Sequence, residues 1–312
     1  MNLKPSENIQ LHGMNHFFTE IIKLYNEKKM PSKILLSGKK GLGKSTLAYH
    51  IINYILSNNE DFEYDLSKHT INKDNKSFKL LQNNSHPNFY LIDLLMDKKN
   101  IDVSQIREMI NYTNKSTFNN MPRFILIDNI ENLNKNSVNA LLKIIEEPNE
   151  NVFFILIHNS EKFILPTLKS RCLIFKINFT FNQSILISNQ ILDENIFDII
   201  NHDLINYYNT PGDIVNLINF SKDSNLDLRD YNLINFLNLL IENKYYKKNK
   251  FIKNLLINFI ELFFLKEYKL CNTKKSLLSF YQAFITKIYN TEKFNLDEES
   301  LFIEFKSKIL NG

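Results

Sequence analysis

The chain has 312 residues, of which 44% are hydrophobic and 12% aromatic, so it is too apolar for a disordered protein and long enough for two or three domains. Its formal net charge of +4 is too small to indicate nucleic-acid binding by itself. The two cysteines, Cys172 and Cys271, exclude a four-cysteine zinc site within one chain, and we expect a reduced cytoplasmic protein without zinc. We expect no secretory signal, because the first 13 residues contain no apolar run. We expect no membrane span, because the most apolar stretch, 251–265, carries Lys253 and Glu261 and is too short.

The first 177 residues alternate between helix and strand patterns. Amphipathic spacing predicts helices over 16–29, 44–56, 103–114 and 136–147, and apolar runs predict strands over 33–37, 89–93, 123–128, 152–157 and 172–177. The Asn- and Lys-rich stretch 58–87 indicates a surface excursion with little regular structure. Continuous apolar strands between helices are typical of a parallel sheet that is buried on both faces.

From residue 178 onwards the pattern is helical, and it includes the segments 184–192 and 195–208. We therefore predict three domains: an α/β domain at 1–177, a small helical domain at 178–222 and a larger helical domain at 223–312. The apolar stretch 251–265 is interpreted as a core helix of the last domain.

A glycine-rich loop, GKKGLGKST at 38–46, matches the pattern G-x-x-x-x-G-K-[ST] between an expected strand and an expected helix. Its glycines let successive backbone N–H groups face phosphate oxygens, Lys44 is suited to the β- and γ-phosphates, and the Ser45 hydroxyl is suited to Mg²⁺. A chance turn is the alternative, and the strand–loop–helix context disfavours it. We expect ATP and Mg²⁺ to bind through Gly38, Lys39, Lys40, Gly41, Leu42, Gly43, Lys44, Ser45 and Thr46.

The expected strand 123–128 ends in Asp128, which can hold Mg²⁺ through its water shell. Active ATPases often have a glutamate at the next position, where it orients the attacking water. Asn129 stands there instead, and an amide is a poor general base. Glu131 is interpreted as a solvated acid at the start of a helix.

The loop, the segment IDVSQIREMINYTN, and the motifs NALLKIIEEP and LPTLKSRC, in this order, resemble the AAA+ clamp-loader subunits of bacterial DNA polymerase III. The resemblance covers roughly residues 8 to 220 and is strongest from 101 to 177. Within the family, SHPNFYLID at 85–93 and the short helical tail are most similar to the delta-prime subunits.

This resemblance implies an AAA+ P-loop ATPase core, a helical lid and an all-α C-terminal oligomerisation domain, the collar. It also implies a hetero-pentamer with gamma or tau and delta subunits, which loads the sliding clamp onto primer–template DNA during DNA replication. Such a chain works in the cytoplasm as part of the DNA-directed DNA polymerase holoenzyme, a nucleotidyltransferase complex, and not on a membrane.

Arginine is rare in this lysine-rich chain, which has Arg107, Arg123, Arg171 and Arg229. In the family, a Ser-Arg-Cys motif presents its arginine to the ATP of the neighbouring subunit, and the resemblance assigns that role to Arg171, flanked by Ser170 and Cys172. A forked guanidinium can bridge γ-phosphate oxygens, which a lysine does less well. The alternative is an arginine at a strand edge, ion-paired within its own domain.

The chain also departs from the family pattern. Many motor and delta-prime subunits carry four cysteines after the P-loop helix, and 58–87 has none. Where motor subunits have a sensor 2 arginine, the lid stretch offers Asp213, Ile214 and Val215, and the sensor 1 region offers His158 or Asn159. The missing sensor 2 arginine, Asn129 and the short tail argue against a gamma/tau-type motor subunit, and the Ser-Arg-Cys context argues against an unrelated AAA+ regulator.

The remaining basic residues have less specific interpretations. Arg107 and Arg123 are expected to be structural, and Arg229 has no evident role. The Lys- and Tyr-rich segment 243–254 is interpreted as a solvated helix face or collar surface rather than as a DNA contact.

Overall fold

The structure is a computed structural model that describes residues 4–95, 98–115, 121–248, 250–270, 274–294 and 296–307. It contains two compact units, one made of Met1–Asp193 and Asn209–Asn219 and the other of Glu194–Tyr208 and Phe220–Gly312. The predicted division into three domains stays a prediction, because contacts distinguish two units. In the described ranges, no helix is long and apolar enough to cross a membrane.

The α/β unit is built on one five-stranded sheet. Its strands are β1 (Lys33–Gly38), β2 (Phe89–Ile92), β3 (Arg123–Ile127), β4 (Val152–Asn159) and β5 (Leu173–Lys176). All pairs are parallel, in the order β2-β3-β4-β1-β5, so β5 forms an edge of the sheet. The expected α/β core with a parallel sheet is confirmed.

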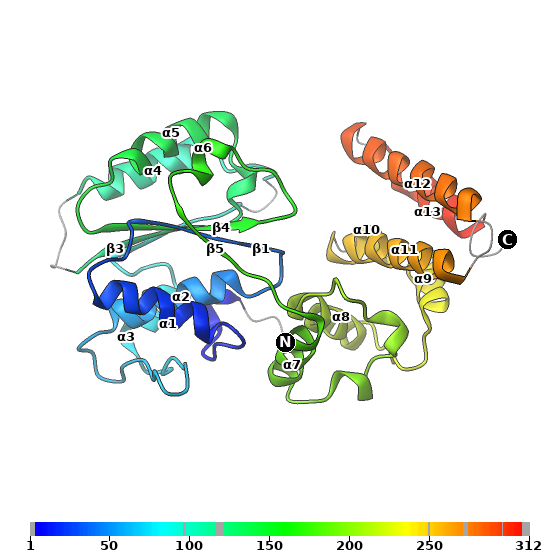
Figure 1. Cartoon of the computed structure of the whole chain (residues 1–312), viewed down its shortest axis with the longest axis horizontal. Coiled ribbons are helices and arrows are strands. Elements are labelled where there is room, and N and C mark those ends of the chain that lie inside the picture. The colour runs from blue at the N-terminus through cyan, green and yellow to red at the C-terminus, as the bar shows by residue number, and fades with distance from the viewer. Residues whose placement is uncertain are drawn as a thin grey trace. The chain divides into compact units, whose positions relative to one another are not determined.

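Helices cover both faces of this sheet (Figure 1). One face carries α1 (Asn15–Asn26), α2 (Lys44–Leu56) and α3 (Lys76–Gln82), and the other carries α4 (Val103–Thr113), α5 (Lys135–Glu146) and α6 (Pro166–Lys169). Alternation along each strand divides the core: Ile34 and Leu36 pack with the first group of helices and Leu35 with the second. This unit also contains the short helices η1 (Pro5–Glu7) and η2 (Ile130–Asn132), the helix α7 (Phe181–Leu192) and the part of α8 (Pro211–Asp223) up to Asn219.

The stretch 58–87 is more ordered than the sequence suggests, because α3 forms within it. Asn75 caps this helix: its Oδ1 accepts the Phe78 N–H at 2.7 Å and the Asn53 side-chain amide at 3.0 Å. The Ser77 hydroxyl is buried and donates to Glu60 at 2.7 Å. The expectation of little regular structure holds for most of 58–87 but is wrong for α3, where these polar side chains serve as caps and internal partners.

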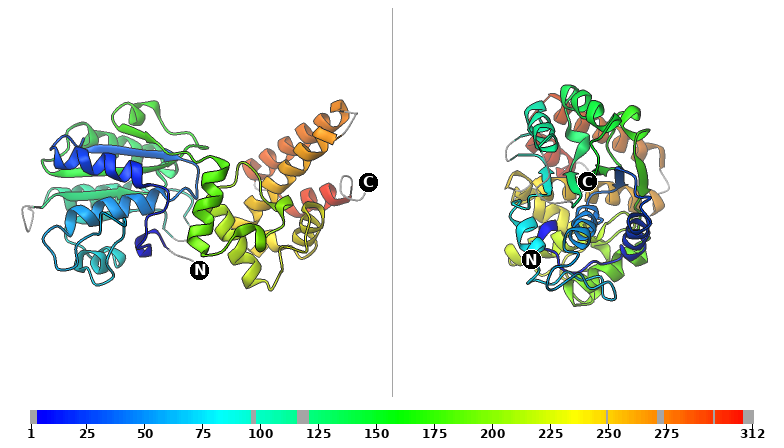
Figure 2. Two further views of the ribbon diagram at one scale, coloured as in Figure 1. Left: turned by 60° about the horizontal axis from the view of Figure 1, so that its bottom comes forward. Right: turned by 90° about the vertical axis from the view of Figure 1, so that its left-hand side faces the viewer.

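The second unit is helical. It contains η3 (Ile196–Asp198), η4 (His202–Leu204), α9 (Leu233–Glu242), α10 (Tyr245–Lys248), α11 (Lys250–Leu270), α12 (Lys274–Phe294) and α13 (Glu298–Phe305). Figure 2 shows α11 and α12 side by side. The predicted core helix lies within α11, whose Phe259 and Ile260 are fully buried, and the expected all-α C-terminal part is confirmed.

Two details of this unit bear on the sequence interpretation. The prediction of one helix over 195–208 is wrong, because two short 3-10 helices, η3 and η4, form there. The side chains of Asn195 and Asn201 accept hydrogen bonds from backbone N–H groups two residues further on, and such local bonds favour short turns over a continuous helix. In the 243–254 cluster, Lys244 and Lys247 pair with Glu299, and Lys253 pairs with Glu298. These lysines therefore join elements of their own unit.

Arg123 is a structural arginine, as expected. It is 5% exposed, and its Nη1 lies 3.2, 3.2 and 2.5 Å from the carbonyl oxygens of Tyr112, Thr113 and Lys115. The guanidinium also lies over the Tyr112 ring, 5.0 Å from its centroid. It thereby satisfies carbonyl groups that α4 leaves unpaired at its C-terminal end.

We predict that Arg123→Met lowers the free energy of unfolding by about 1–3 kcal/mol, because three carbonyl oxygens at the end of α4 lose a charged donor while the apolar volume is largely kept. Chemical denaturation measures this change. The matched control is Arg229→Met, which removes an exposed arginine paired with Asp227 and should alter stability by less than about 1 kcal/mol. Equal effects of the two substitutions would contradict the structural role of Arg123.

His50 is a fully buried histidine in α2. Its Nδ1 lies 2.9 Å from the Tyr64 hydroxyl and its Nε2 lies 3.1 Å from the Asn8 carbonyl oxygen. Burial lowers the pKa of His50 to about 4, although the Asn8 carbonyl partly opposes this shift. The folded protein therefore holds His50 neutral at pH values where the unfolded chain protonates it.

We predict that the free energy of unfolding is unaffected by protonation of His50 above pH 6.5 and decreases as the pH falls from 6.5 towards 4, because only the unfolded chain binds the proton in this range. One pKa unit corresponds to about 1.4 kcal/mol, so the loss amounts to roughly 3 kcal/mol. His50→Gln should flatten the decline in unfolding free energy over this range, whereas the exposed His16→Gln should leave it unchanged. An identical decline in all three proteins would contradict the assignment to His50.

Candidate nucleotide-binding site

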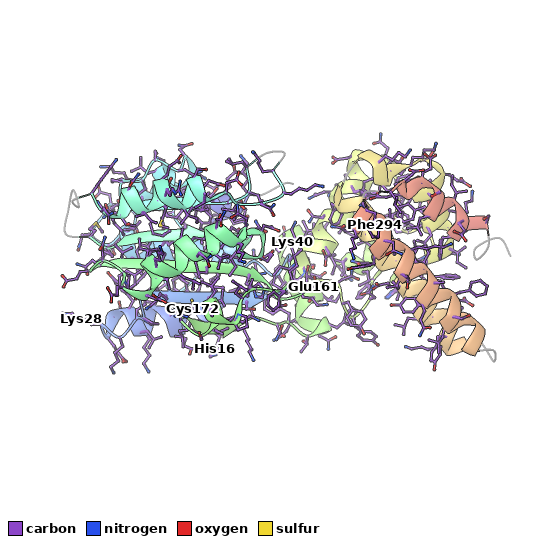
Figure 3. All side chains as sticks on the ribbon, turned by 90° about the horizontal axis from the view of Figure 1, so that it is seen from above. His16, Lys28, Lys40, Glu161, Cys172 and Phe294 are labelled. Carbon is purple, nitrogen blue, oxygen red and sulfur yellow. The ribbon has the colours of Figure 1, made fainter. Side chains whose placement is uncertain are left out.

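The glycine-rich loop lies between β1 and α2, as the sequence predicts. Gly41 and Gly43 both have φ of +83°, a backbone conformation that favours glycine. Lys44 begins α2, and its Nζ donates to the carbonyl oxygens of Gly38 at 2.9 Å and Lys39 at 2.5 Å. Figure 3 labels Lys40 and Glu161 at this end of the sheet and Lys28 at the opposite end. A curled loop before a helix N-terminus suits phosphate groups.

Lys44 is only 6% exposed, which is unusual for a lysine. Burial lowers its pKa to about 8, while the carboxylates of Asp128, Glu131 and Glu161 act in the opposite direction. Most of the lysine is therefore still charged at neutral pH. An ammonium held in this way is a strong partner for phosphate oxygens, because it has lost most of its water.

Asp128 follows β3 and meets the start of α2, where the Ser45 hydroxyl donates to its Oδ2 at 2.5 Å. Burial raises the pKa of Asp128, and the Ser45 hydrogen bond opposes that shift. Magnesium in nucleotide sites takes one or two carboxylates together with phosphate oxygens and water, so this hydroxyl–carboxylate pair fits the ion. No group of three His, Cys, Asp or Glu side chains in the described ranges is arranged to hold a metal without a nucleotide.

Asn129 is held by a residue that sequence reasoning missed. Its side-chain amide donates to Asp93 Oδ1 at 2.7 Å, and its backbone N–H donates to Asp128 Oδ1 at 2.7 Å. Asn129 has φ of +54°, which asparagine tolerates better than most residues. Asp93 directly follows β2, so an acid at the end of a predicted strand was the available signal.

Glu131 and the end of β4 also belong to this site. Glu131 lies in the first turn of η2, as the sequence interpretation expected, but it is only partly exposed to solvent. Its Oε2 accepts the Asn159 N–H at 3.1 Å, and its charge acts on Lys44. His158 is buried, with Nδ1 2.9 Å from the Ser37 hydroxyl and Nε2 2.9 Å from the Lys162 carbonyl oxygen. Both ring nitrogens thus have structural partners, and Oδ1 of Asn159, the other sensor 1 candidate, accepts the Glu161 N–H at 3.2 Å.

The start of α8 contacts the loop directly. The Gly212 N–H donates to the Gly41 carbonyl oxygen at 2.9 Å, and a Cβ on Gly212 would lie 2.6 Å from the Gly41 Cα. Asp213 accepts bonds from the Thr210 N–H at 3.0 Å and the Thr210 hydroxyl at 2.8 Å, as in a capping box. Asp213 therefore caps α8. It belongs to the stretch 213–215, which the resemblance places at the sensor 2 arginine of motor subunits. The sequence T-P-G-D at 210–213 is enough to predict the cap of α8, but it does not predict the contact between Gly212 and Gly41.

Arg171 lies just after α6 and before the edge strand β5, with its side chain 34% exposed. Its Nη2 donates to Glu146 Oε1 at 2.5 Å and its Nη1 donates to the Thr167 carbonyl oxygen at 2.9 Å. Among the described residues it has no hydrogen bond or ion pair with the glycine-rich loop. The ion pair that the alternative interpretation expects is thus present. The flanking Cys172 is half-buried, and burial raises the pKa of its thiol to about 11.

Residues 13–180, more than half of the chain, match the family model described as DNA polymerase III, delta subunit. The chain belongs to this family. It is 28% identical over 292 residues to DNA polymerase III subunit delta-prime from Buchnera aphidicola (subspecies Schizaphis graminum), a match that covers 88% of this chain and 83% of that protein.

Other comparisons cover less. A second delta-prime relative, from Buchnera aphidicola (subspecies Baizongia pistaciae), is 29% identical over 184 residues, or 57% of this chain, and the match spans about half of that protein, 51%. The solved structure of a DNA polymerase III gamma subunit-related protein from Thermotoga maritima is 17% identical, with a TM-score of 0.42, over 83% of this chain and 76% of that one. The resemblance seen in the sequence motifs is confirmed by the family match.

We predict that Lys44→Ala weakens ATP binding by roughly 10- to 100-fold, because a charged donor to the phosphates is removed. Titration with a fluorescent ATP analogue measures the affinity. Lys79→Ala is the matched control, since this exposed lysine of α3 pairs only with Asp74 and should bind as the wild type does. Equal affinity of Lys44→Ala and wild type would contradict the assignment of the site.

Proposed function

We propose that this chain is a delta-prime-type subunit of a clamp loader, that it binds ATP with Mg²⁺ at its own glycine-rich loop, and that it supplies Arg171 to the ATP of a neighbouring subunit. The family match and the delta-prime relative that covers most of the chain support the first part. The geometry of the loop supports the second. The position of Arg171, just before the edge strand β5, supports the third part.

Arg171 lies near the amino-terminal ends of the strands, whereas the loop lies at their carboxyl-terminal ends. Leu173, two residues after Arg171, pairs with Ile34 near the start of β1, whereas the loop begins at Gly38, the end of β1. Four residues of extended strand span roughly 13 Å. Glu146 holds the guanidinium near the amino-terminal ends of the strands, which is too far from the chain's own ATP site. The same position suits the ATP of a neighbouring subunit that packs against the exposed strand β5.

The other arginines are poorer candidates. Arg123 is buried against carbonyl groups, and Arg229 is tied to Asp227 in the helical unit. Arg107 lines an open groove of about 730 Å³ between α4 and α5, and α4 contacts β2, the edge strand on the other side of the sheet from β5. Arg171 alone among the four combines partial exposure with a place beside β5.

The chain's own site should bind ATP and hydrolyse it slowly. The loop N–H groups and Lys44 would hold the phosphates, and Ser45 and Asp128 would hold the magnesium ion, which neutralises phosphate charge when bound. Asn129, bonded to Asp93, cannot accept a proton from an attacking water as a carboxylate does. We therefore expect turnover by the lone subunit to be far below that of the assembled complex.

The proposed partners are the gamma or tau and delta subunits in a hetero-pentamer, which acts on the sliding clamp and on primer–template DNA in the cytoplasm. The helical residues 223–312 would form the oligomerisation collar, and 178–222 the lid. A gamma/tau-type motor is the second candidate. Asn129 disfavours it, and so does the stretch Asp213, Ile214 and Val215, which has no arginine where a motor subunit would carry one. Co-purification of the partner chains distinguishes this proposal from an unrelated AAA+ regulator.

We predict that Arg171→Lys leaves assembly and this chain's own ATP binding intact but lowers ATP hydrolysis of the reconstituted complex in the presence of clamp and primed DNA. Arginine fingers contribute on the order of 10³-fold or more in rate. Total turnover should fall only partly, because one of several sites is affected, and clamp loading should fall more if it needs every site. Lysine keeps the charge and removes the fork, so this variant tests the guanidinium itself.

The control is Lys169→Gln, which removes an exposed positive charge two residues away. It should retain wild-type hydrolysis and loading. Wild-type values for Arg171→Lys in both assays, in a complex shown to be fully assembled, would mean that Arg171 is structural.

A further inference from the structure

The guanidinium of Arg171 is held at both ends of its fork. Glu146, the last residue of α5, accepts a bond from Nη2 at 2.5 Å, and the carbonyl oxygen of Thr167 in α6 accepts one from Nη1 at 2.9 Å. Two acceptors from different helices fix both the position and the plane of the group. A single acceptor would leave the guanidinium free to rotate.

This arrangement leaves donors available for a ligand. An arginine side chain has five N–H donors, and in the described part of the chain only two of them are used. The Arg171 side chain is 34% exposed and that of Glu146 is 50% exposed, so an approaching molecule can reach the pair. A phosphate that takes two of the remaining donors does not have to displace Glu146.

The backbone at Glu146 is held by the packing of α5. Its neighbour Ile145 is fully buried in the core between α5 and the sheet, and Leu141, one turn earlier, is also fully buried. The C-terminal end of α5 carries a partial negative charge, which adds to the attraction for a guanidinium at this point. The carboxylate therefore ties Arg171 to the sheet through a packed helix.

We propose that Glu146 is a positioning residue for Arg171: it holds the guanidinium in the orientation in which its free N–H donors meet the γ-phosphate of the neighbouring subunit's ATP. This proposal rests on the proposed function of Arg171. Exposed ion pairs contribute little to folding stability, whereas a misplacement of about 1 Å in a reacting geometry can cost roughly 100-fold in rate. Loss of Glu146 should therefore affect hydrolysis far more than folding.

The test uses the complex reconstituted with gamma or tau and delta subunits, clamp and primed DNA, and compares Glu146→Gln, Arg171→Ala and the double variant. We expect Glu146→Gln to lower kcat for the Arg171-dependent part of ATP hydrolysis by roughly 10- to 100-fold, with KM for ATP within about twofold of wild type. In the Arg171→Ala background the same substitution should have no further effect. Thermal unfolding of the isolated variant should match that of the wild type.

Two further variants sharpen the result. Glu147→Gln removes the adjacent exposed carboxylate, which borders the α4–α5 groove, and should hydrolyse ATP at the wild-type rate. Glu146→Asp keeps the charge but shortens the side chain, and it should recover part of the lost kcat.

The outcomes separate this proposal from the function on which it rests. If Arg171→Ala itself has no effect, the proposed function fails and the present proposal fails with it. If Arg171→Ala is impaired while Glu146→Gln is as fast as wild type or faster, or if Glu146→Gln causes the same loss in both backgrounds, the positioning role alone is overturned.

Discussion

The parallel pairing of β1, β3 and β4 is the constraint on which both candidate sites depend. Parallel strands end at a common edge, so Gly38 at the end of β1 lies beside Asn159 at the end of β4, and Asp128 follows β3 at the same edge. A shift of one residue in the β3–β4 register would turn every side chain of β3 to the other face and take Asp128 away from Ser45. The apolar side chains of the two cores hold this register, because each strand buries alternate residues on opposite faces.

The same strands and helices separate the two sites. Helix α5 begins a few residues after Asp128 and ends at Glu146, and twelve helical residues span about 18 Å. Arg171 therefore lies with the amino-terminal ends of the strands, whereas the glycine-rich loop lies with their carboxyl-terminal ends. The ion pair with Glu146 and a role in trans are compatible, since an exposed pair is worth about 1 kcal/mol or less and a rate factor of 10³ about 4 kcal/mol. The proposed role in trans therefore does not require the ion pair with Glu146 to be absent.

Sequence reasoning predicted those parts of the fold and site that depend on local pattern. The glycine-rich loop, Asp128 and the five strands were predictable because spacing and apolar runs act within a few residues. Asp93, Glu131 and Gly212 were missed or misinterpreted because their partners, Asn129, Asn159 and Gly41, are fixed only when strands and helices come together. Asparagine side chains explain the errors in secondary structure. Asn75 caps α3, which the Asn- and Lys-rich composition of 58–87 did not suggest. Asn195 and Asn201 start two short turns where apolar spacing had predicted one continuous helix.

The most direct test of the role of Arg171 is the structure of the assembled complex, determined by cryo-electron microscopy with a non-hydrolysable ATP analogue. The quantity to measure is the distance between the Arg171 Nη atoms and the γ-phosphate oxygens of the nucleotide bound by the adjacent subunit. We expect about 2.7–2.9 Å, with Glu146 still bound to the guanidinium. An Arg171 that contacts only Glu146 and Thr167, beyond hydrogen-bonding distance of any phosphate in a fully assembled and nucleotide-loaded complex, would contradict the proposal.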